Sequence, residues 1–240
     1  MLVSTKGIVI HKTKYGDSGI IVKLYTEKFG TLSFIIKNAF SKKNKLNNAH
    51  FEPLALLEIN FDNKKPDRIQ FLKEINHYYH FSKIPFNNIR NSLLIFYNEL
   101  LYKLLFDAGE DAVLYDFLEK SIIDLDTEET LTDIHIKFMI QLSKILGFCP
   151  DNQYSEKNCY FNFNTGFYTP IFFENQNILS KKASSYLNEL INNMGNSRLT
   201  TFPAKAIRNE LLNGLIYYFK LHNEHIKNIE SVEIIADILN

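Results

Sequence analysis

Hydrophobic and polar residues alternate along the first 76 residues in the way that strands require. Short runs rich in Ile, Val, Leu and Phe are separated by segments with the composition of turns, such as Gly16–Ser18 and Asp62–Asp67. Five strands are enough to close a small barrel. We expect them at Thr5–Thr13, Gly19–Thr26, Thr31–Lys37, Leu54–Phe61 and Arg68–Asn76.

The second and third runs indicate which side chains face the barrel interior. Side chains alternate across a strand, so the even-numbered apolar positions would form the core: Ile20, Val22, Leu24, Leu32, Phe34 and Ile36. The outer face would then carry Lys23, Tyr25 and Ile35. A cation beside an aromatic ring suits a nucleic-acid strand, although an ordinary amphipathic strand pair has the same pattern.

Beyond Ile75 the spacing of apolar residues changes to a helical period. The segment Asn76–Asn88 has no clear period, and we place a domain boundary there, with domains at 1–80 and 81–240. Asp126 with Glu129 resembles a capping box for the third helix. Helices are expected from Asn87 or Asn88 to Gly109, Val113 to Ile122, Asp126 to Gly147, Ser180 to Met194, and from Pro203 and Ser231.

An insert at about 148–173 interrupts these helices. The alternating residues Tyr160–Phe163 and the turn-like Gly166–Thr169 predict a small β-hairpin. The fold class is therefore α+β, with a five-stranded barrel followed by an all-α helical domain that carries the hairpin.

Charge is divided unevenly between the two halves of the chain. The 240 residues have a net charge of zero, but residues 1–85 hold 14 Lys and Arg against 7 Asp and Glu, and the remainder holds 13 against 20. A basic front half indicates a module that binds a polyanion, although solvated lysines are common on any surface.

Composition excludes several classes of protein. With 45% hydrophobic and 22% charged residues the chain has a globular composition, and no apolar stretch has the length of a membrane span. The first ten residues lack a signal-peptide core, and the two cysteines do not suggest a disulfide framework. We expect a cytoplasmic protein.

Catalytic motifs are missing from the sequence. We find no glycine-rich phosphate loop and no nucleophile elbow. The pairs His77/His80 and His222/His225 have a spacing that a metal could use, but neither has an evident third ligand, and surface histidines explain them better. We attribute the acidic group at 124–129 to the start of a helix. We expect no enzyme and no cofactor.

The segment Lys37–Lys45 supplies four lysines in nine residues, with Phe40 among them and no acid. Such a loop can follow a phosphate backbone without reading the sequence of bases, and a solubilising loop is the alternative. Together with other cations of the barrel it predicts a DNA-binding surface made of Lys12, Lys14, Lys23, Tyr25, Lys37, Phe40, Lys42, Lys43, Lys45, Lys64, Lys65 and Arg68.

A second basic group lies in the acidic half, where 28 residues contain a single acid, Glu189. Its cations and the neighbouring apolar helix faces could hold an acidic peptide that ends in hydrophobic residues. Scattered surface charges explain the group equally well. The residues are Lys181, Lys182, Arg198, Lys205 and Arg208.

Three segments near the N-terminus resemble the bacterial recombination mediators of the RecO family. They are Gly7–Ile10 (GIVI), Lys14–Ile21 (KYGDSGII) and Tyr25–Gly30 (YTEKFG). Leu146–Pro150 (LGFCP) is similar to the family's segment before its zinc module, and Tyr217–His222 with Ser231 resembles its last helices.

The resemblance implies an N-terminal OB-fold and a C-terminal helical domain. It also implies binding of single- and double-stranded DNA, annealing of complementary strands, and help for RecA on strands covered by single-stranded DNA-binding protein. The implied partners are RecR and the acidic C-terminal tail of single-stranded DNA-binding protein, and the implied location is the nucleoid.

Two departures from the family pattern change these expectations. Many members carry four cysteines for zinc, whereas this chain has only Cys149 and Cys159, so we expect no zinc and a hairpin held by aromatic packing. At Lys37–Phe40 the family usually has glycine after the lysine, and a basic residue ends the motif. Asn38 can still adopt a left-handed turn, and the charge would pass to Lys42, Lys43 and Lys45.

These features predict a DNA repair and recombination mediator that screens phosphate repulsion between strands. A protein-only adaptor, which scaffolds a repair complex with little DNA contact, is the alternative.

Overall fold

The structure is a computed structural model that describes residues 2–41, 43–63, 69–173, 177–193 and 203–238. These residues form two compact units, 1–127 and 128–240. The predicted boundary near residue 80 is where strands give way to helices, but the helices up to Thr127 belong to the same compact unit as the strands. The division into domains at 80/81 therefore stays a prediction.

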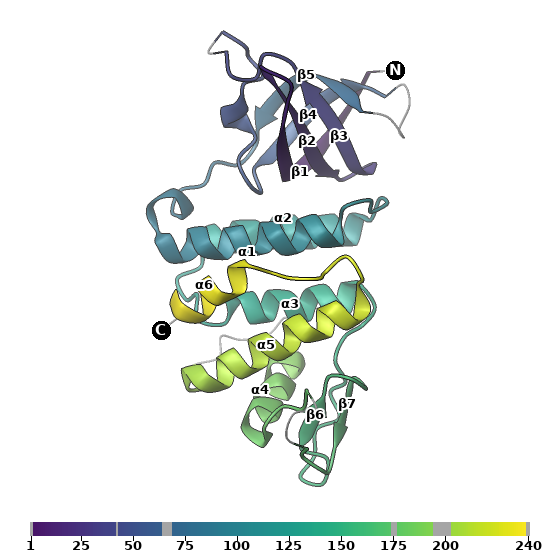
Figure 1. Cartoon of the computed structure of the whole chain (residues 1–240), viewed down its shortest axis with the longest axis vertical. Helices are drawn as coiled ribbons and strands as arrows, with labels where there is room; N and C mark the ends of the chain where they lie inside the picture. Colours follow the sequence, from purple (N-terminus) through teal and green to yellow (C-terminus); the bar gives the residue numbers. More distant parts are fainter. Residues whose placement is uncertain (1, 42, 64–68, 174–176, 194–202, 239–240) are drawn as a thin grey trace. The chain divides into compact units, whose positions relative to one another are not determined.

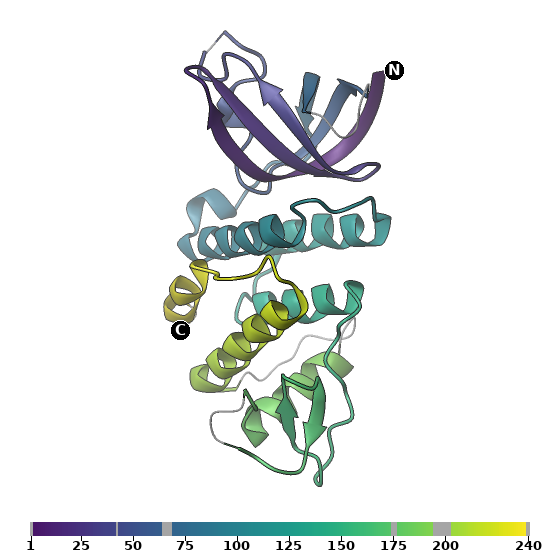
Figure 2. The same cartoon turned by 45° about the vertical axis from the view of Figure 1, so that its right-hand side comes forward.

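Five strands close into a barrel in the order β1-β2-β3-β5-β4, with β3 and β5 parallel and the other neighbours antiparallel. Figure 2 shows the long β1 curving around the barrel. The predicted barrel and the α+β class are confirmed. The strands are β1 (Leu2–Tyr15), β2 (Gly19–Thr26), β3 (Gly30–Ile36), β4 (Leu56–Asp62) and β5 (Gln70–His77), with a 3₁₀ turn η1 (Asn48–His50) before β4.

The barrel core consists of the side chains that the alternation assigned to it. Every even-numbered apolar residue predicted to face inward on β2 and β3 is buried in one cluster. Phe34 and Phe61 meet edge to face with ring centroids 5.1 Å apart, and Phe51 closes the cluster from the segment before β4. The period of two along each strand therefore predicted the interior correctly.

Two helices complete the first unit. They are α1 (Asn88–Leu104) and α2 (Ala112–Thr127), preceded by the 3₁₀ turn η2 (Ile84–Phe86). Asn87, one of the two caps that the sequence allowed, caps α1 by accepting a hydrogen bond from the Arg90 backbone N–H. Figure 1 shows α1 and α2 lying next to the barrel, and an ion pair of 2.9 Å between Lys6 Nζ on β1 and Glu119 Oε1 on α2 joins the two.

The predicted capping box at Asp126 and Glu129 is wrong. Asp126 belongs to the last turn of α2, and its buried carboxylate accepts hydrogen bonds from the backbone N–H groups of Ser82, Lys83 and Ile84. The carboxylate therefore holds the chain at the entry to η2 instead of starting a helix.

The second unit contains α3 (Ile134–Ile145), α4 (Lys181–Asn192), α5 (Lys205–His222) and α6 (Ser231–Ile238). The predicted hairpin is confirmed as β6 (Tyr160–Asn162) paired with β7 (Phe167–Thr169). Its aromatic rings are packed as expected, because Phe161 and Phe163 are buried with centroids 5.0 Å apart. Within the described residues, no helix combines the length and apolar character needed to cross a membrane.

Candidate nucleic-acid interface

The basic loop after β3 is held in a defined turn. Asn38 has a positive φ of 53°, so the predicted left-handed conformation is confirmed. Its side-chain oxygen accepts a hydrogen bond of 3.1 Å from Ser18 Oγ, and the Ala39 backbone N–H donates to the Ser18 carbonyl at 2.8 Å. The Asn44 amide donates to the Lys37 carbonyl at 2.8 Å. The two bonds to Ser18 tie the loop to the turn between β1 and β2, and the Asn44 bond joins the two ends of the loop.

Four of the predicted lysines gather at this end of the barrel. Lys14 lies at the end of β1, Lys37 directly follows β3, and Lys43 and Lys45 lie in the loop; all four are exposed. The strand register brings Lys14 opposite Ile20 and Ile20 opposite Ile36, so the ends of β1 and β3 flank the same end of β2. We call the exposed residues here the basic end: Lys14, Lys37, Phe40, Lys43, Lys45 and Phe71.

The basic end combines cations with exposed aromatic rings. Phe40 is 54% exposed and Phe71 is 57% exposed, and the Lys37 ammonium lies 5.5 Å from the centroid of the Phe71 ring. Asp17, in the adjoining turn, is an exposed carboxylate. Such a surface can bind phosphates by charge and bases by stacking.

Sequence reasoning missed Phe71. In the run Ile69–Leu72 apolar residues occupy both faces of the strand, so alternation does not indicate which of them point outward. The structure buries Gln70 and Leu72 and exposes Ile69 and Phe71, because the parallel pairing of β5 with β3 sets Gln70 opposite the buried Phe34.

The stacking role predicted for Tyr25 is wrong, because its ring is 0% exposed. Tyr25 packs against Tyr115 of α2 with ring centroids 6.2 Å apart, and its hydroxyl donates to the Asp111 carbonyl at 3.4 Å. Burial raises the pKa of Tyr25 to about 12. Alternation placed this side chain correctly on the outside of the barrel, but the helices of the same unit cover that part of the outer face.

Lys23 contacts the segment that connects α1 to α2. Its ammonium donates to the Phe106 carbonyl at 2.8 Å and lies 3.1 Å from the centroid of the Phe106 ring. Burial lowers the pKa of Lys23, which is the expected effect on a cation withdrawn from water. We therefore leave Lys23 out of the proposed interface.

The remaining predicted cations of the barrel have different surroundings. Lys12 forms a surface ion pair of 3.4 Å with Glu52, which reduces its availability to a phosphate. The other four lie outside the described residues: Lys42, Lys64, Lys65 and Arg68.

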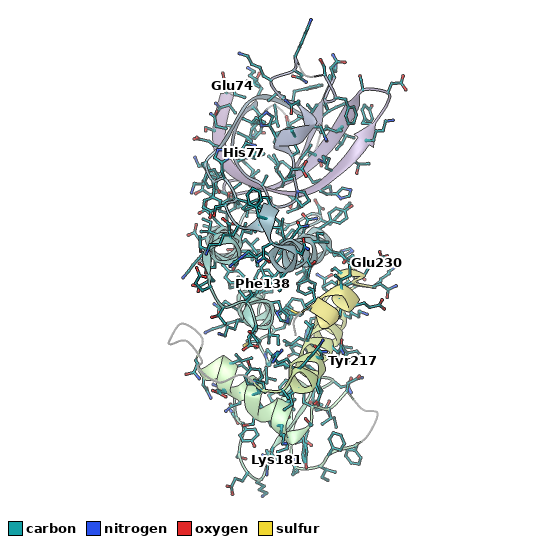
Figure 3. All side chains as sticks on the ribbon, turned by 90° about the vertical axis from the view of Figure 1, so that its left-hand side faces the viewer. Glu74, His77, Phe138, Lys181, Tyr217 and Glu230 are labelled. Carbon is teal, nitrogen blue, oxygen red and sulfur yellow. The ribbon has the colours of Figure 1, made fainter. Side chains whose placement is uncertain are left out.

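Only some residues of the second basic group are exposed. Lys181 and Lys182 are exposed in the first turn of α4, which Ser180 caps, and Figure 3 labels Lys181 at the end of that helix. Lys205 is half-buried in the first turn of α5. Arg198 lies outside the described residues.

The surface role predicted for Arg208 is wrong. This residue is 9% exposed, and its Nη1 donates to the Pro203 carbonyl at 2.7 Å while Nε lies 4.0 Å from Asp133 Oδ1. Tyr186 of α4 donates to the other carboxylate oxygen of Asp133. Arg208 therefore joins a buried polar group among the helices of the second unit.

The cysteines and histidines do not form a metal site within the described residues, where no three of the usual ligands come together. Cys149 is half-buried, Cys159 is buried, and both are free thiols, so the donor set does not fit a four-coordinate structural zinc. The predicted surface histidine pairs are partly packed: His77 lies 3.2 Å from His50 between ring nitrogens, and His222 stacks on Phe148 at 4.6 Å.

A closed five-stranded barrel that presents cations and aromatic rings at one end defines a protein of the OB-fold class. Comparison with known families then identifies the chain. The model "Recombination protein O N terminal" matches residues 1–80, and "Recombination protein O C terminal" matches residues 86–228. The chain belongs to the RecO family, as the resemblance of its first 30 residues indicated.

Relatives named DNA repair protein RecO extend this similarity over the full length. The protein of Flavobacterium psychrophilum is 28% identical over 242 residues, and that of Phocaeicola vulgatus is 26% identical over 242 residues, with 100% of each chain covered. The protein of Bacteroides fragilis is 28% identical over 249 residues, again with 100% coverage of both chains. The chain therefore has a role in DNA repair and recombination.

Proposed function

We propose that this protein is a recombination mediator that binds single- and double-stranded DNA at the basic end and anneals complementary strands. The observation that carries the proposal is the gathering of Lys14, Lys37, Lys43 and Lys45 at one end of the barrel. In the family context, this activity would assist RecA on strands covered by single-stranded DNA-binding protein, at the nucleoid in the cytoplasm.

The mechanism we propose is charge screening without a chemical step. Two DNA strands repel each other through their phosphates, and a protein that neutralises several phosphates lowers this barrier. Lysines contact phosphates as point charges and do not occupy base edges, so the bases of the bound strand remain able to pair.

Binding of this kind depends on salt. If each of the four lysines neutralises one phosphate of a single strand, the logarithm of the affinity falls with the logarithm of the salt concentration at a slope of about −3. The base sequence of the DNA should have little effect on affinity, because contacts to phosphates are the same for every base.

Fluorescence anisotropy with labelled oligonucleotides at rising salt tests the proposal. Replacing both Lys43 and Lys45 with Gln should weaken binding and reduce the salt slope by about 1.4. The matched control is the double change Lys181→Gln and Lys182→Gln, which removes the same charge from another exposed pair of lysines and should leave DNA binding intact.

The same two variants separate DNA binding from partner binding. We propose that Lys181 and Lys182, at the N-terminal end of α4, bind the acidic tail of single-stranded DNA-binding protein, since a helix N-terminus and two cations favour carboxylates. The α4 variant should lose affinity for the tail peptide and the loop variant should keep it. RecR is a further proposed partner, testable by co-purification.

If the wild-type protein shows no salt-dependent binding to DNA but still binds the tail peptide or RecR, the protein-only adaptor is the correct alternative. Strand-annealing rates measured with complementary oligonucleotides would then be the same with and without protein.

A further inference from the structure

An apolar row crosses the outside of the barrel beside the basic end. The strand register sets Thr13 opposite Ile21, Ile21 opposite Ile35, and Ile35 opposite Phe71, across β1, β2, β3 and β5. Residues directly opposite each other in a sheet point to the same face. This face is the outer one, because the neighbours of Ile35 and Phe71 along their strands are buried in the core.

The row ends in an exposed aromatic ring under a cation. Phe71 is 57% exposed, whereas Ile21 and Ile35 are half-buried. Lys37 Nζ lies 5.5 Å from the centroid of the Phe71 ring. An apolar surface next to a positive charge is complementary to a nucleotide, which has a flat base and a negative phosphate.

Helices α1 and α2 contact other positions on these strands. Tyr102 of α1 stacks on His11 with ring centroids 4.0 Å apart, and Tyr115 of α2 packs against Tyr25. The residues that follow α1 bind Lys23 and Thr31 through the Phe106 and Leu105 carbonyls. An OB-fold commonly binds oligonucleotides on the face of its second and third strands. Here part of that face is occupied by the protein's own helices, while the row from Ile21 to Phe71 lies at the opposite end of the same strands.

We infer that Phe71, Ile35 and Ile21 form a stacking platform for one unpaired base, with Lys37 holding the adjoining phosphate. The inference rests on the proposed function, because it assigns a specific subsite to the DNA bound at the basic end. Stacking requires a free base face, which a single strand offers and a continuous duplex does not. The platform therefore gives the barrel a preference for single strands.

This arrangement also suits annealing. A base stacks on Phe71 through the flat face of the base. The Watson–Crick edge of that base remains open to an incoming complementary strand. The platform orders a base without competing for the hydrogen bonds of the duplex that forms.

The chain contains no tryptophan, so Phe71→Trp introduces a single reporter at the platform. Its fluorescence should be quenched by a single-stranded thymidine oligonucleotide and not by a blunt-ended duplex of the same length. Phe86→Trp is the matched control. Phe86 is 88% exposed on η2 and is not one of the residues that make up the basic end. Its fluorescence should respond to neither ligand.

Affinity provides the second measurement. Phe71→Ala should weaken binding of the single strand by about 5- to 150-fold, the range that corresponds to loss of one aromatic–base stack. It should leave duplex binding and the salt slope unchanged. Phe71→Trp should retain the affinity. Phe86→Ala should behave as wild type.

The outcomes separate the two proposals. If Phe71→Ala binds single strands like wild type and Phe71→Trp is not quenched, the platform is overturned, while lysine-dependent binding leaves the proposed function in place. Equal quenching by single strand and duplex would also overturn the platform, because selectivity for an unpaired base would be absent. If the wild-type protein binds no DNA, both the proposed function and the platform that rests on it are overturned.

Discussion

Asp126 Oδ1 accepts a hydrogen bond of 2.8 Å from the backbone N–H of Ile84, 42 residues earlier in the chain. The same carboxylate accepts bonds from Ser82 and Lys83, so the end of α2 organises the segment that leads from the barrel into the first helix. Burial raises the pKa of this carboxyl, but the hydrogen bonds outweigh burial and lower the pKa to about 2.

Replacing Asp126 with Asn should therefore destabilise the first unit by roughly 2 kcal/mol at neutral pH. Because the folded pKa is depressed, this stabilisation is present above the unfolded pKa and is lost as pH falls toward 2. Chemical denaturation of wild type and variant across pH measures the difference. The exposed carboxylate Asp116 on the same helix provides the control, Asp116→Asn; a difference that stays constant from pH 7 to pH 2 would contradict the prediction.

Because Lys23 contacts Phe106 of the same unit, replacing Lys23 should change the stability of the protein and leave DNA binding unchanged. Lys23→Met keeps the apolar stem on the Phe106 ring but removes the donor to the Phe106 carbonyl. Anisotropy should give the wild-type salt slope, whereas Lys37→Met should reduce it by about 0.7. A reduced salt slope for Lys23→Met would show that Lys23 contacts DNA and belongs to the interface.

Gly30 lies against the segment that connects α1 to α2. Its φ is +64°, and an added Cβ would overlap the backbone of Ala108 and Gly109. Gly16 has a similar φ of +61°, but an added Cβ there has no neighbour within 4 Å. Gly30→Ala should therefore destabilise the protein by at least about 2 kcal/mol, and Gly16→Ala by about 1 kcal/mol. Thermal unfolding of the two variants separates steric overlap, expected only at Gly30, from backbone strain, expected at both glycines. Equal losses of stability in the two variants would contradict the close contact at Gly30.

Because Tyr186 donates to the buried carboxylate of Asp133, we expect the stability lost on replacing Tyr186 to depend on pH. Burial raises the pKa of Asp133, and the Tyr186 hydroxyl partly offsets this effect by donating to the carboxylate. Since the folded pKa is raised, stability falls as pH rises from the unfolded pKa of about 3.9 through the folded one. Tyr186→Phe should cost about 1–3 kcal/mol at pH 7 and less at pH 4. Urea denaturation at the two pH values checks the sign, with the exposed Ser185→Ala on the same helix as control.

Removal of metal ions should not change stability. Phe161, Phe163 and Tyr168 pack together in the hairpin, and the two thiols do not fit a zinc site. A chelator should leave the unfolding midpoint where it is; a fall that added zinc reverses would show that the hairpin binds metal.

Local patterns in the sequence were sufficient to predict most elements and the barrel interior. The even-numbered residues of β2 and β3 face inward as predicted. Asn87, one of two predicted caps, caps α1, and α4 begins next to Ser180, where a helix was expected. These features depend on neighbours along the chain, where the periods of strand and helix and the unsatisfied groups of a helix end apply directly.

The interface required knowledge of contacts between distant segments. Tyr25 and Phe71 both point away from the barrel interior, yet Tyr25 is covered by α2 and Phe71 is exposed. Periodicity indicates the face on which a side chain lies, but it contains no information about what packs against that face. Arg208 and Asp126 illustrate the same limit, because partners 75 and 42 residues away bury charges that resemble surface residues in the sequence.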